Sequence, residues 1–345
     1  MMRDYIDNHS LTRDPPLNPR DAFYGGRTEN YVKFYETKND EKIKYVDVTS
    51  LYPYICKAGK FPLRHPVLYI GESECRDFAG QNYENFSTKV EGIVYCKILP
   101  PRNLFHPVLP IKMHGKLLFG LCRTCCEEMS KIDCIHKNED LRCFKGTWVS
   151  LELKKALEMG YVIKTVYEIW QYQMTQYDSV SKNGDLFAEY IDTFYKLKTK
   201  ASGLPEEFAT IAEYVEYIKE QEGIELDGSR FEKNPSFRVV EKTCLNSLWG
   251  FFGQQENKTQ TRIVDNPSDL HALLTSPMTE VSGIVPVNDN ILYVSTRFKE
   301  DTFIPLNTAN VIVAAFVTAQ ARLKLYSYLE KLGESTIYCD TDSAN

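Results

Sequence analysis

Apolar residues in the first half of the chain form short alternating or continuous runs, which are typical of strands. Such runs predict strands at 42–48, 66–71, 91–100 and 162–172. A helix with a serine at its start is expected at 150–161. Residues 1–22 are polar and contain proline, so we expect a linker or tail there. The segment 101–145 has no clear period and is expected to be mostly loop.

From residue 185 onward the apolar positions recur at helical spacing. The predicted helices are 185–200, 206–221, 234–250 and 307–333. In the third helix Asn234 is the expected N-cap, Pro235 the first residue and Gly250 the stop. The last helix is apolar nearly all round in its first half, so it should be buried. Further strands are expected near 278–285, 290–298 and 335–340. This irregular order of strands and helices favours an α+β fold.

Composition excludes some classes of protein but not an enzyme that acts on nucleic acid. The formal net charge is -6, which argues against a simple polyanion-binding module, although a local basic groove can lie on an acidic body. No apolar run reaches bilayer-spanning length, and the first ten residues lack the apolar core of a signal peptide. The ten cysteines are therefore expected to be reduced thiols or metal ligands.

Three aspartates follow predicted strands, and this placement suggests a metal site. Asp47 ends the strand at 42–48, whereas Asp340 and Asp342 end the strand at 335–340. Positions i and i+2 of a strand point to the same face, and like charges that lie close together repel unless a cation relieves them. Three such carboxylates could hold two Mg²⁺ ions about 3.5–4 Å apart. The alternative is that each aspartate only ends a strand or starts a turn.

The helix at 235–249 carries a basic face. Lys242, Asn246 and Trp249 are spaced at i, i+4 and i+7, and Arg238 precedes them by one turn. Arginine, lysine and asparagine in a row suit a triphosphate, and the aromatic ring could stack on a base or a ribose. A solvated basic face beside a core tryptophan is the alternative. The opposite side is expected to pack through Val240, Cys244 and Ser247.

Cysteine and histidine gather between residues 122 and 143. Cys122 and Cys125 have the spacing of a zinc-finger pair, and Cys134 and His136 follow closely. These four residues are predicted to bind a structural Zn²⁺, with Cys126 and Cys143 as alternative ligands or a set of metal-free thiols as the other interpretation. The remaining cysteines lie in apolar surroundings and are expected in the core: Cys56, Cys75, Cys96, Cys244 and Cys339.

Three segments together carry a resemblance that none carries alone. "DVTSLYP" (Asp47–Pro53), "KTCLNSLWG" (Lys242–Gly250) and "YCDTDS" (Tyr338–Ser343) resemble, in order and spacing, the three polymerase motifs of family B DNA polymerases. "FYGG" (Phe23–Gly26) is similar to a motif of the protein-primed branch, found in phages, adenoviruses, linear plasmids and Maverick/Polinton transposons. The resemblance covers about residues 23–343.

The resemblance implies a role for each matching residue. Asp47, Asp340 and Asp342 would be catalytic, with Asp47, Asp342 and the Val48 carbonyl binding Mg²⁺. Tyr52 would be the steric gate against ribose. The implied nucleotide-binding residues also include Lys198, Arg238, Lys242, Asn246 and Trp249. Phe23, Gly25 and Gly26 would contact the template, whereas Thr341 and Ser343 would lie near the primer end. Trp249 departs from the family, which usually has tyrosine there, so a stacking surface is kept and a hydroxyl is lost.

The fold implied by the resemblance is α+β, with a right-hand polymerase palm made of an antiparallel sheet and packed helices, plus helical fingers. The expected segments are 1–22 linker, 23–71 first palm part, 72–183 insertion with the zinc site, 184–252 fingers, 253–303 second insertion and 304–345 second palm part. An exonuclease domain, a thumb and the return strand after the last motif are expected to be absent, which would expose an edge of the strand at 335–340.

The implied function is that of a DNA-directed DNA polymerase. It would perform template-dependent nucleotidyl transfer with two Mg²⁺ ions, in protein-primed replication of a viral or transposon-like element. The implied partners are a DNA primer-template, dNTPs and a terminal protein, and no membrane. Two alternatives stay open: an inactive polymerase fragment that only binds nucleic acid or a partner, and a metal-dependent nuclease. The nuclease would leave Tyr52, Lys242 and Asn246 without a role.

Overall fold

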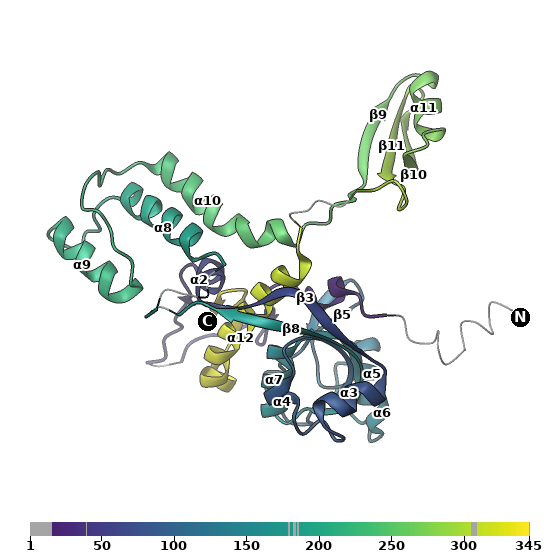
Figure 1. The fold of residues 1–345 in the computed structure, drawn as a ribbon, viewed down its shortest axis with the longest axis horizontal. Coiled ribbons are helices and arrows are strands. Elements are labelled where there is room, and N and C mark those ends of the chain that lie inside the picture. The colour runs from purple at the N-terminus through teal and green to yellow at the C-terminus, as the bar shows by residue number, and fades with distance from the viewer. Residues whose placement is uncertain are drawn as a thin grey trace, which may run out of the picture. The chain divides into compact units, whose positions relative to one another are not determined.

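The protein forms two compact units in a computed structural model, which describes residues 16–38, 40–178, 180–181, 184, 186–304 and 309–344. The first unit combines the chain up to Gly250 with the segment from Val311 onward. The second unit is Phe251–Asn310, and the predicted second insertion, 253–303, lies inside it. Figure 1 shows the elements of both.

A small antiparallel sheet of the first unit joins the two ends of the described chain. Its strands are β1 (Thr28–Asn30), β12 (Tyr338–Asp340), β13 (Ser343–Ala344) and β2 (Val46–Asp47), in that spatial order. The return strand was expected to be absent, but β13 pairs with both β12 and β2. Since β12 has neighbours on both sides, the expected exposed edge at 335–340 is wrong as well.

The first half of helix α12 (Val311–Leu332) is buried, as its apolar pattern predicts. It packs against α2 (Leu51–Ala58), a short helix that follows β2. The 3-10 turn η2 (Gly333–Ser335) then leads into β12. Leu325 and Leu329 of α12 form a small core with Cys339 and Ala344, which anchors the last motif. Among the helices that the structure describes, none combines the length and apolarity needed to cross a bilayer.

The largest core lies around a second antiparallel sheet of the same unit. Its strands are β3 (Lys60–Ile70), β8 (Val162–Gln176), β4 (Gly92–Leu99) and β7 (Phe144–Val149), in that order. Helices α3 (Glu72–Ala79), α4 (Phe86–Lys89) and α7 (Ser150–Glu158) accompany it. The fully buried side chains of Phe86, Trp148 and Ile169 belong to this core.

Two segments expected to be irregular have structure. The segment 101–145 contains β5 (Pro110–Met113), β6 (Lys116–Phe119), α5 (Arg123–Glu127) and α6 (Glu139–Arg142). The described end of the predicted tail contains the 3-10 turn η1 (Pro19–Ala22). There Leu17 is buried and its N–H donates to a Glu168 carboxylate oxygen at 2.8 Å, so these residues belong to the folded unit.

Three helices form the segment predicted as fingers: α8 (Ala188–Ser202), α9 (Ile211–Glu222) and α10 (Pro235–Phe252). The Asn234 cap of α10 is confirmed, because its Oδ1 accepts the Phe237 N–H at 3.0 Å. The predicted stop at Gly250 is wrong, since α10 continues to Phe252. The predicted packing face is also wrong: Glu241 and Leu245 are the buried residues of α10, whereas Val240 is exposed.

The second unit is a three-stranded antiparallel sheet with one helix. Its elements are β9 (Gln260–Val264), α11 (Pro267–Leu274), β10 (Thr279–Asn288) and β11 (Ile291–Phe298). The strand order is β10, β11, β9. The two predicted strands correspond to β10 and β11, whereas β9 and α11 were not predicted.

Candidate active site

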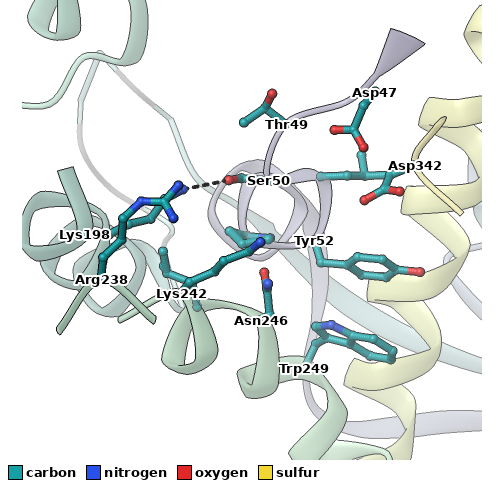
Figure 2. Close-up of a pocket in the computed structure, with 13 residues that line it drawn as sticks. Asp47, Thr49, Ser50, Tyr52, Lys198, Arg238, Lys242, Asn246, Trp249 and Asp342 are labelled. Atoms are coloured by element: carbon teal, nitrogen blue, oxygen red, sulfur yellow. Dashed lines mark hydrogen bonds between the residues drawn. The ribbon is translucent and has the colours of Figure 1, made fainter. Parts of the chain in front are cut away.

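A cavity of about 450 Å³ in the first unit collects most of the residues predicted to bind metal and nucleotide (Figure 2). We call it the Asp47 cavity. Its lining residues are Asp47, Thr49, Ser50, Leu51, Tyr52, Pro53, Lys198, Arg238, Lys242, Leu245, Asn246, Trp249 and Asp342. They come from β2, α2, α8, α10 and the turn after β12, so segments nearly 300 residues apart meet at one place.

Pairing between β2 and β13 brings two of the three predicted carboxylates together. Asp47 lies opposite Ser343 in the ladder, and the Val48 N–H donates to the Asp342 carbonyl at 2.7 Å. The expectation that Asp340 and Asp342 share one strand face is wrong, because the strand ends at Asp340. Thr341 then takes the left-handed conformation, with φ of 55°, and turns the chain so that Asp342 enters the cavity.

The two cavity carboxylates repel each other. Partial burial raises the pKa of Asp342, and the neighbouring charge of Asp47 raises it further. Within the described residues neither carboxylate has an ion-pair partner, although both line a cavity that also contains basic side chains. The arrangement is therefore suited to a bound cation.

Asp340 lies apart from this pair. Its Oδ1 accepts hydrogen bonds from the hydroxyls of Thr28 at 2.8 Å and Thr341 at 2.9 Å. The bond from Thr28 has the largest effect in lowering the pKa of Asp340, and the bond from Thr341 lowers it further. Asp340 is not among the residues that line the cavity, so the structure does not unite all three predicted carboxylates.

Basic side chains occupy the opposite side of the Asp47 cavity (Figure 2). Lys198 of α8 donates to the Ser50 hydroxyl at 3.3 Å, and Arg238 of α10 donates to the Ser202 hydroxyl at 3.0 Å. Lys242 lies one turn beyond Arg238 and is exposed. Ser50 does not cap α2: it has a left-handed backbone and makes no side-chain cap bond. Its hydroxyl is available to Lys198 instead.

Two aromatic rings stack within the cavity wall. The rings of Tyr52 and Trp249 have centroids 4.6 Å apart and an interplanar angle of 13°. Such a contact contributes about 0.5–1.5 kcal/mol beyond simple burial. Burial raises the pKa of Tyr52 to about 12, with Arg322 opposing and Asp342 adding to the shift, so its hydroxyl is neutral at physiological pH. Trp249 of the second motif therefore stacks on Tyr52 of the first motif.

The predicted template-contacting glycines border the turn of the last motif. A Cβ at Gly26 would lie 2.8 Å from the Thr341 Cγ2 and Oγ1, so only glycine allows this approach. The Arg27 carbonyl accepts the Thr341 N–H at 2.7 Å. Gly25 is exposed with open space beside it, and Phe23 is half-buried.

Ser343 and Val48 have structural contacts that the sequence did not indicate. Ser343 is 3% exposed, and its hydroxyl donates to the Asp340 carbonyl at 3.1 Å. This bond closes the turn that carries Asp342, so the side chain does not face solvent. The half-buried Val48 holds Asp342 through its N–H, as described above.

A buried ion pair that sequence reasoning missed supports the glycine segment. Arg322 of α12 pairs with Glu152 of α7 through Nε–Oε1 at 2.8 Å and Nη2–Oε2 at 2.9 Å. Its Nη1 donates to the carbonyls of Tyr24 at 2.8 Å and Gly25 at 2.7 Å. A charged residue in the mostly apolar stretch 311–323 was the available signal.

The predicted zinc ligands form a separate cluster. Cys122, Cys125, Cys134 and His136 lie together, and none of them lines the Asp47 cavity.

Known proteins match this chain over most of its length. The family described as DNA polymerase type B, organellar and viral, matches residues 17–334. A probable DNA polymerase of Podospora anserina is 24% identical over 346 residues, which cover 93% of this chain and 22% of that protein. Probable DNA polymerases of Neurospora intermedia and Agaricus bitorquis are 22% and 21% identical, over 93% and 99% of this chain. The chain spans 26% and 38% of the lengths of these two relatives.

Solved structures show the same fold. Phi29 DNA polymerase, in a ternary complex with primer-template DNA and incoming nucleotide, matches 94% of this chain and 42% of its own length. The TM-score is 0.51 at 17% identity. Its complex with single-stranded DNA gives 0.52 at 16% identity. The predicted α+β polymerase fold is confirmed.

Proposed function

This chain belongs to the organellar and viral type B DNA polymerases, and on that premise we propose that it forms the nucleotide-binding and catalytic part of a DNA-directed DNA polymerase. The reaction would be template-directed addition of a deoxynucleotide to a primer 3′-hydroxyl, with release of pyrophosphate. The relatives it matches bear the name probable DNA polymerase.

One observation carries this proposal: carboxylates and cations line opposite sides of one cavity, beside a stacked aromatic pair. The carboxylates are Asp47 and Asp342, and the cations are Lys198, Arg238 and Lys242. A nucleoside triphosphate has the matching chemistry, since its phosphates need cations and its base and sugar need a flat apolar wall. A nuclease has no use for such a wall.

The donor set fits Mg²⁺. Asp47 and Asp342 supply hard oxygen ligands, and the cavity has space for substrate phosphates to complete a coordination shell. These two aspartates would hold the metal, with the Val48 carbonyl as a further proposed ligand. When bound, a pair of such ions would activate the primer hydroxyl and neutralise the leaving pyrophosphate.

The remaining side chains act on the triphosphate itself. Lys242 and Arg238 lie one helical turn apart on α10, so they can contact successive phosphates and offset the charge that develops there. Lys198 reaches the cavity from α8 and is oriented by Ser50. Asn246 continues the same face of α10 and can donate a neutral hydrogen bond.

The aromatic pair would act on the sugar. Tyr52 has a ring held by stacking on Trp249 and stays close to the carboxylates. A ring fixed in this way excludes a ribose 2′-hydroxyl by contact, which is the proposed gate role. The hydroxyl that tyrosine would place at position 249 is not needed for stacking.

We propose that DNA lies along the segment from Phe23 to Gly26 and the turn at Thr341. Gly25 is exposed, so a phosphate backbone can approach it closely, whereas Asp340 and Ser343 stabilise the turn from within. Initiation from a terminal protein is the finer proposal, supported by the Phe-Tyr-Gly-Gly motif. The insertion at 72–183 would contact that protein, and the insertion at 253–303 would help enclose DNA.

Primer extension with purified protein tests the proposal. The wild-type chain should extend a DNA primer only with template, dNTPs and Mg²⁺. Asp342→Asn should lower the rate by about a thousandfold or more, because it removes a metal ligand and leaves the shape unchanged. Asp77→Asn on the exposed surface of α3 is the matched control and should extend normally.

Nucleotide binding separates loss of chemistry from loss of the whole site. Mg²⁺-dependent dNTP binding should weaken about tenfold in Lys242→Ala and recover partly in Lys242→Arg. Wild-type levels of extension by Asp342→Asn would overturn the catalytic assignment. Equal dNTP affinity in Lys242→Ala and wild type would overturn the triphosphate site.

A further inference from the structure

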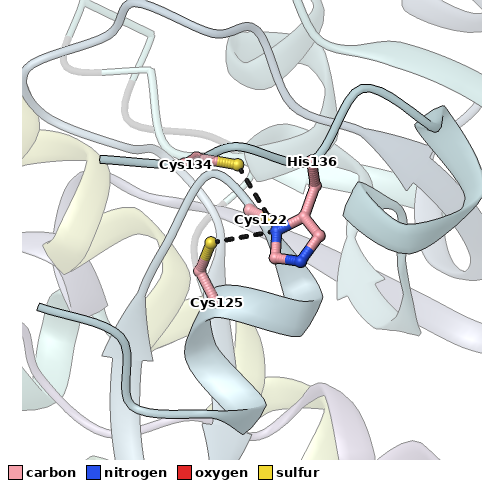
Figure 3. Close-up of side chains that lie close together, drawn as sticks. All are labelled: Cys122, Cys125, Cys134 and His136. Atoms are coloured by element: carbon pink, nitrogen blue, oxygen red, sulfur yellow. Dashed lines mark hydrogen bonds between the residues drawn. The ribbon is translucent and has the colours of Figure 1, made fainter. Parts of the chain in front are cut away.

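Four ligand-type side chains converge in the segment between β6 and β7 (Figure 3). The His136 Nδ1 lies 3.5 Å from the Cys122 Sγ, 3.3 Å from the Cys125 Sγ and 3.7 Å from the Cys134 Sγ. All four ligand atoms lie within 4.8 Å of one another. Residues separated by up to 14 positions in the chain thus surround one point.

These separations match those of ligands around a single tetrahedral ion. Zn–S bonds of about 2.3 Å and Zn–N bonds of about 2.0–2.1 Å at tetrahedral angles place sulfur and nitrogen about 3.6 Å apart. The three observed distances of 3.3, 3.5 and 3.7 Å lie on both sides of this value. Simple packing of side chains would not be expected to place three sulfur atoms at such similar distances from one imidazole nitrogen.

The chemistry of the donors selects the metal. Three thiolates and one imidazole are soft and borderline ligands, which suit Zn²⁺ and exclude the hard cations Mg²⁺ and Ca²⁺. Four protein ligands also fill a tetrahedral shell, which is typical of a structural site and leaves no position for a substrate.

The alternative ligands have other roles. Cys126 packs against the large core, and a Cβ at Gly120 would collide with its sulfur. Cys143 is buried at the end of α6, and its N–H donates to the Glu139 carbonyl. Neither belongs to the cluster, so the structure chooses among the six candidates that the sequence left open.

The segment around the cluster lacks a hydrophobic core of its own. From Glu127 to Leu141 every residue is exposed except the half-buried His136. The apolar side chains of Met129, Ile132 and Ile135 are each more than two-thirds exposed, so their burial cannot stabilise the loop. A segment without buried apolar surface needs another source of stability, and a metal centre supplies it.

Contacts at the base of the loop connect the cluster to the sheet. Cys122 is buried, and the Arg102 guanidinium donates to the His136 carbonyl at 3.2 Å. The buried Arg142 donates to the carbonyls of Pro100 and Pro101, both at 2.9 Å, where β4 ends. A metal at the cluster would therefore fix the whole loop against this end of the sheet.

We propose that Cys122, Cys125, Cys134 and His136 bind one structural Zn²⁺ that folds the segment between Gly120 and Cys143. The site is independent of nucleotidyl transfer, because none of its ligands lines the Asp47 cavity. Absence of zinc would leave the proposed polymerase function untouched. Absence of polymerase activity would likewise leave the proposed zinc site untouched.

Metal content tests the proposal directly. Protein purified in reducing buffer with zinc present should contain about one Zn²⁺ per chain by atomic emission spectroscopy. Cys125→Ala and His136→Ala should each lose most of it. Cys126→Ala is the matched control, since it removes a neighbouring thiol outside the cluster, and it should keep the wild-type content. Co²⁺ exchanged into the wild-type protein should show thiolate charge-transfer and tetrahedral ligand-field bands.

Limited proteolysis gives a second readout that needs no variant. Trypsin can cleave after Lys131 and Lys137, which lie in the exposed loop. A zinc chelator should accelerate cleavage at these two sites about tenfold or more, while cleavage elsewhere in the first unit stays unchanged. Wild-type protein with less than about a fifth of an equivalent of zinc would overturn the proposal. Equal zinc in Cys125→Ala and Cys126→Ala, or chelator-independent cleavage, would overturn it as well.

Discussion

The buried ion pair between Arg322 and Glu152 should dominate the stability of the first unit. The side chains are 3% and 1% exposed, and they make two direct hydrogen bonds of 2.8 and 2.9 Å. Arg322 also donates to the carbonyls of Tyr24 and Gly25. Arg322→Met keeps a long unbranched side chain but removes all four of these bonds.

The expected loss in the free energy of unfolding comes from the buried groups that Arg322→Met leaves without a partner. A buried carboxylate without its partner costs about 3–5 kcal/mol. The buried Tyr24 carbonyl, left without a donor, costs about 1–3 kcal/mol more. The carbonyl of the exposed Gly25 can accept a hydrogen bond from water instead, so it adds little to this cost. Arg322→Met should therefore lower the free energy of unfolding by about 4–8 kcal/mol, a large share of the stability of an ordinary domain.

A double-mutant cycle shows whether the stranded charge is the cause. Arg322→Met combined with Glu152→Met removes both charges, so only the carbonyl penalty should remain. The double variant should thus be more stable than Arg322→Met alone by about 2 kcal/mol or more. Urea unfolding followed by tryptophan fluorescence measures each free energy, and Trp148 lies in the core that contains Tyr24.

A surface ion pair provides the control. Arg76 pairs with Glu72 on α3, and these side chains are 31% and 48% exposed. Arg76→Met should cost less than about 1 kcal/mol. If Arg322→Met costs no more than Arg76→Met, the buried ion pair does not dominate the stability of the first unit. If the loss in the double variant equals the sum of the two single losses, Arg322 and Glu152 do not stabilise each other.

Three further predictions concern the sugar gate, the glycine contact and pH. Tyr52→Val should raise ribonucleotide incorporation about tenfold or more, since it removes the ring stacked on Trp249; single-nucleotide extension with ribo- and deoxynucleotides measures this. Gly26→Ala should cost about 1–3 kcal/mol in urea unfolding because its Cβ would meet Thr341 at 2.8 Å, and Thr341→Gly should restore part of the loss. Burial lowers the pKa of His106, so the unfolded chain takes up a proton that the folded chain does not, and the free energy of unfolding should fall as pH drops below about 6.5.

Each of these predictions has a matched control. Tyr52→Phe keeps the ring and should keep the sugar preference, so an unchanged preference in Tyr52→Val would remove the gate role. Failure of Thr341→Gly to restore stability to Gly26→Ala would contradict the contact between them. His106→Gln should flatten the fall in stability below pH 6.5, and an unchanged slope would assign the effect to other groups.

Local patterns predicted the five longest of the described helices and several strands. The first half of α12 is apolar nearly all round and is buried, and Asn234 caps α10 as its position before Pro235 indicates. Such elements depend on neighbours in the chain, so a period or a cap residue is sufficient to find them. The strand at 42–48 was predicted too long, because only Val46–Asp47 finds a partner strand.

The candidate site was predicted as a set of residues but not as a geometry. The three motifs indicated Asp47, Lys242 and Asp342, and all three line one cavity. Their order in the chain could not show that Thr341 takes a left-handed conformation. That single turn directs Asp342 into the cavity and leaves Asp340 bonded to Thr28 and Thr341.

Other features depended on contacts between distant segments. Sequence spacing left six possible zinc ligands, and the structure reduced them to four, because Cys126 packs against the core and Cys143 is buried outside the cluster. Likewise, Trp249 stacks on Tyr52, although the two residues are 197 positions apart in the chain.

Local order and composition were sufficient to indicate the family, the longer helices and the types of residue that the chemistry requires. The tertiary structure alone decided which carboxylates face the cavity, which thiols meet the histidine, and that Arg322 holds the glycine segment. These depend on long-range pairing, whose free energy comes from burial and hydrogen bonds that no local pattern records.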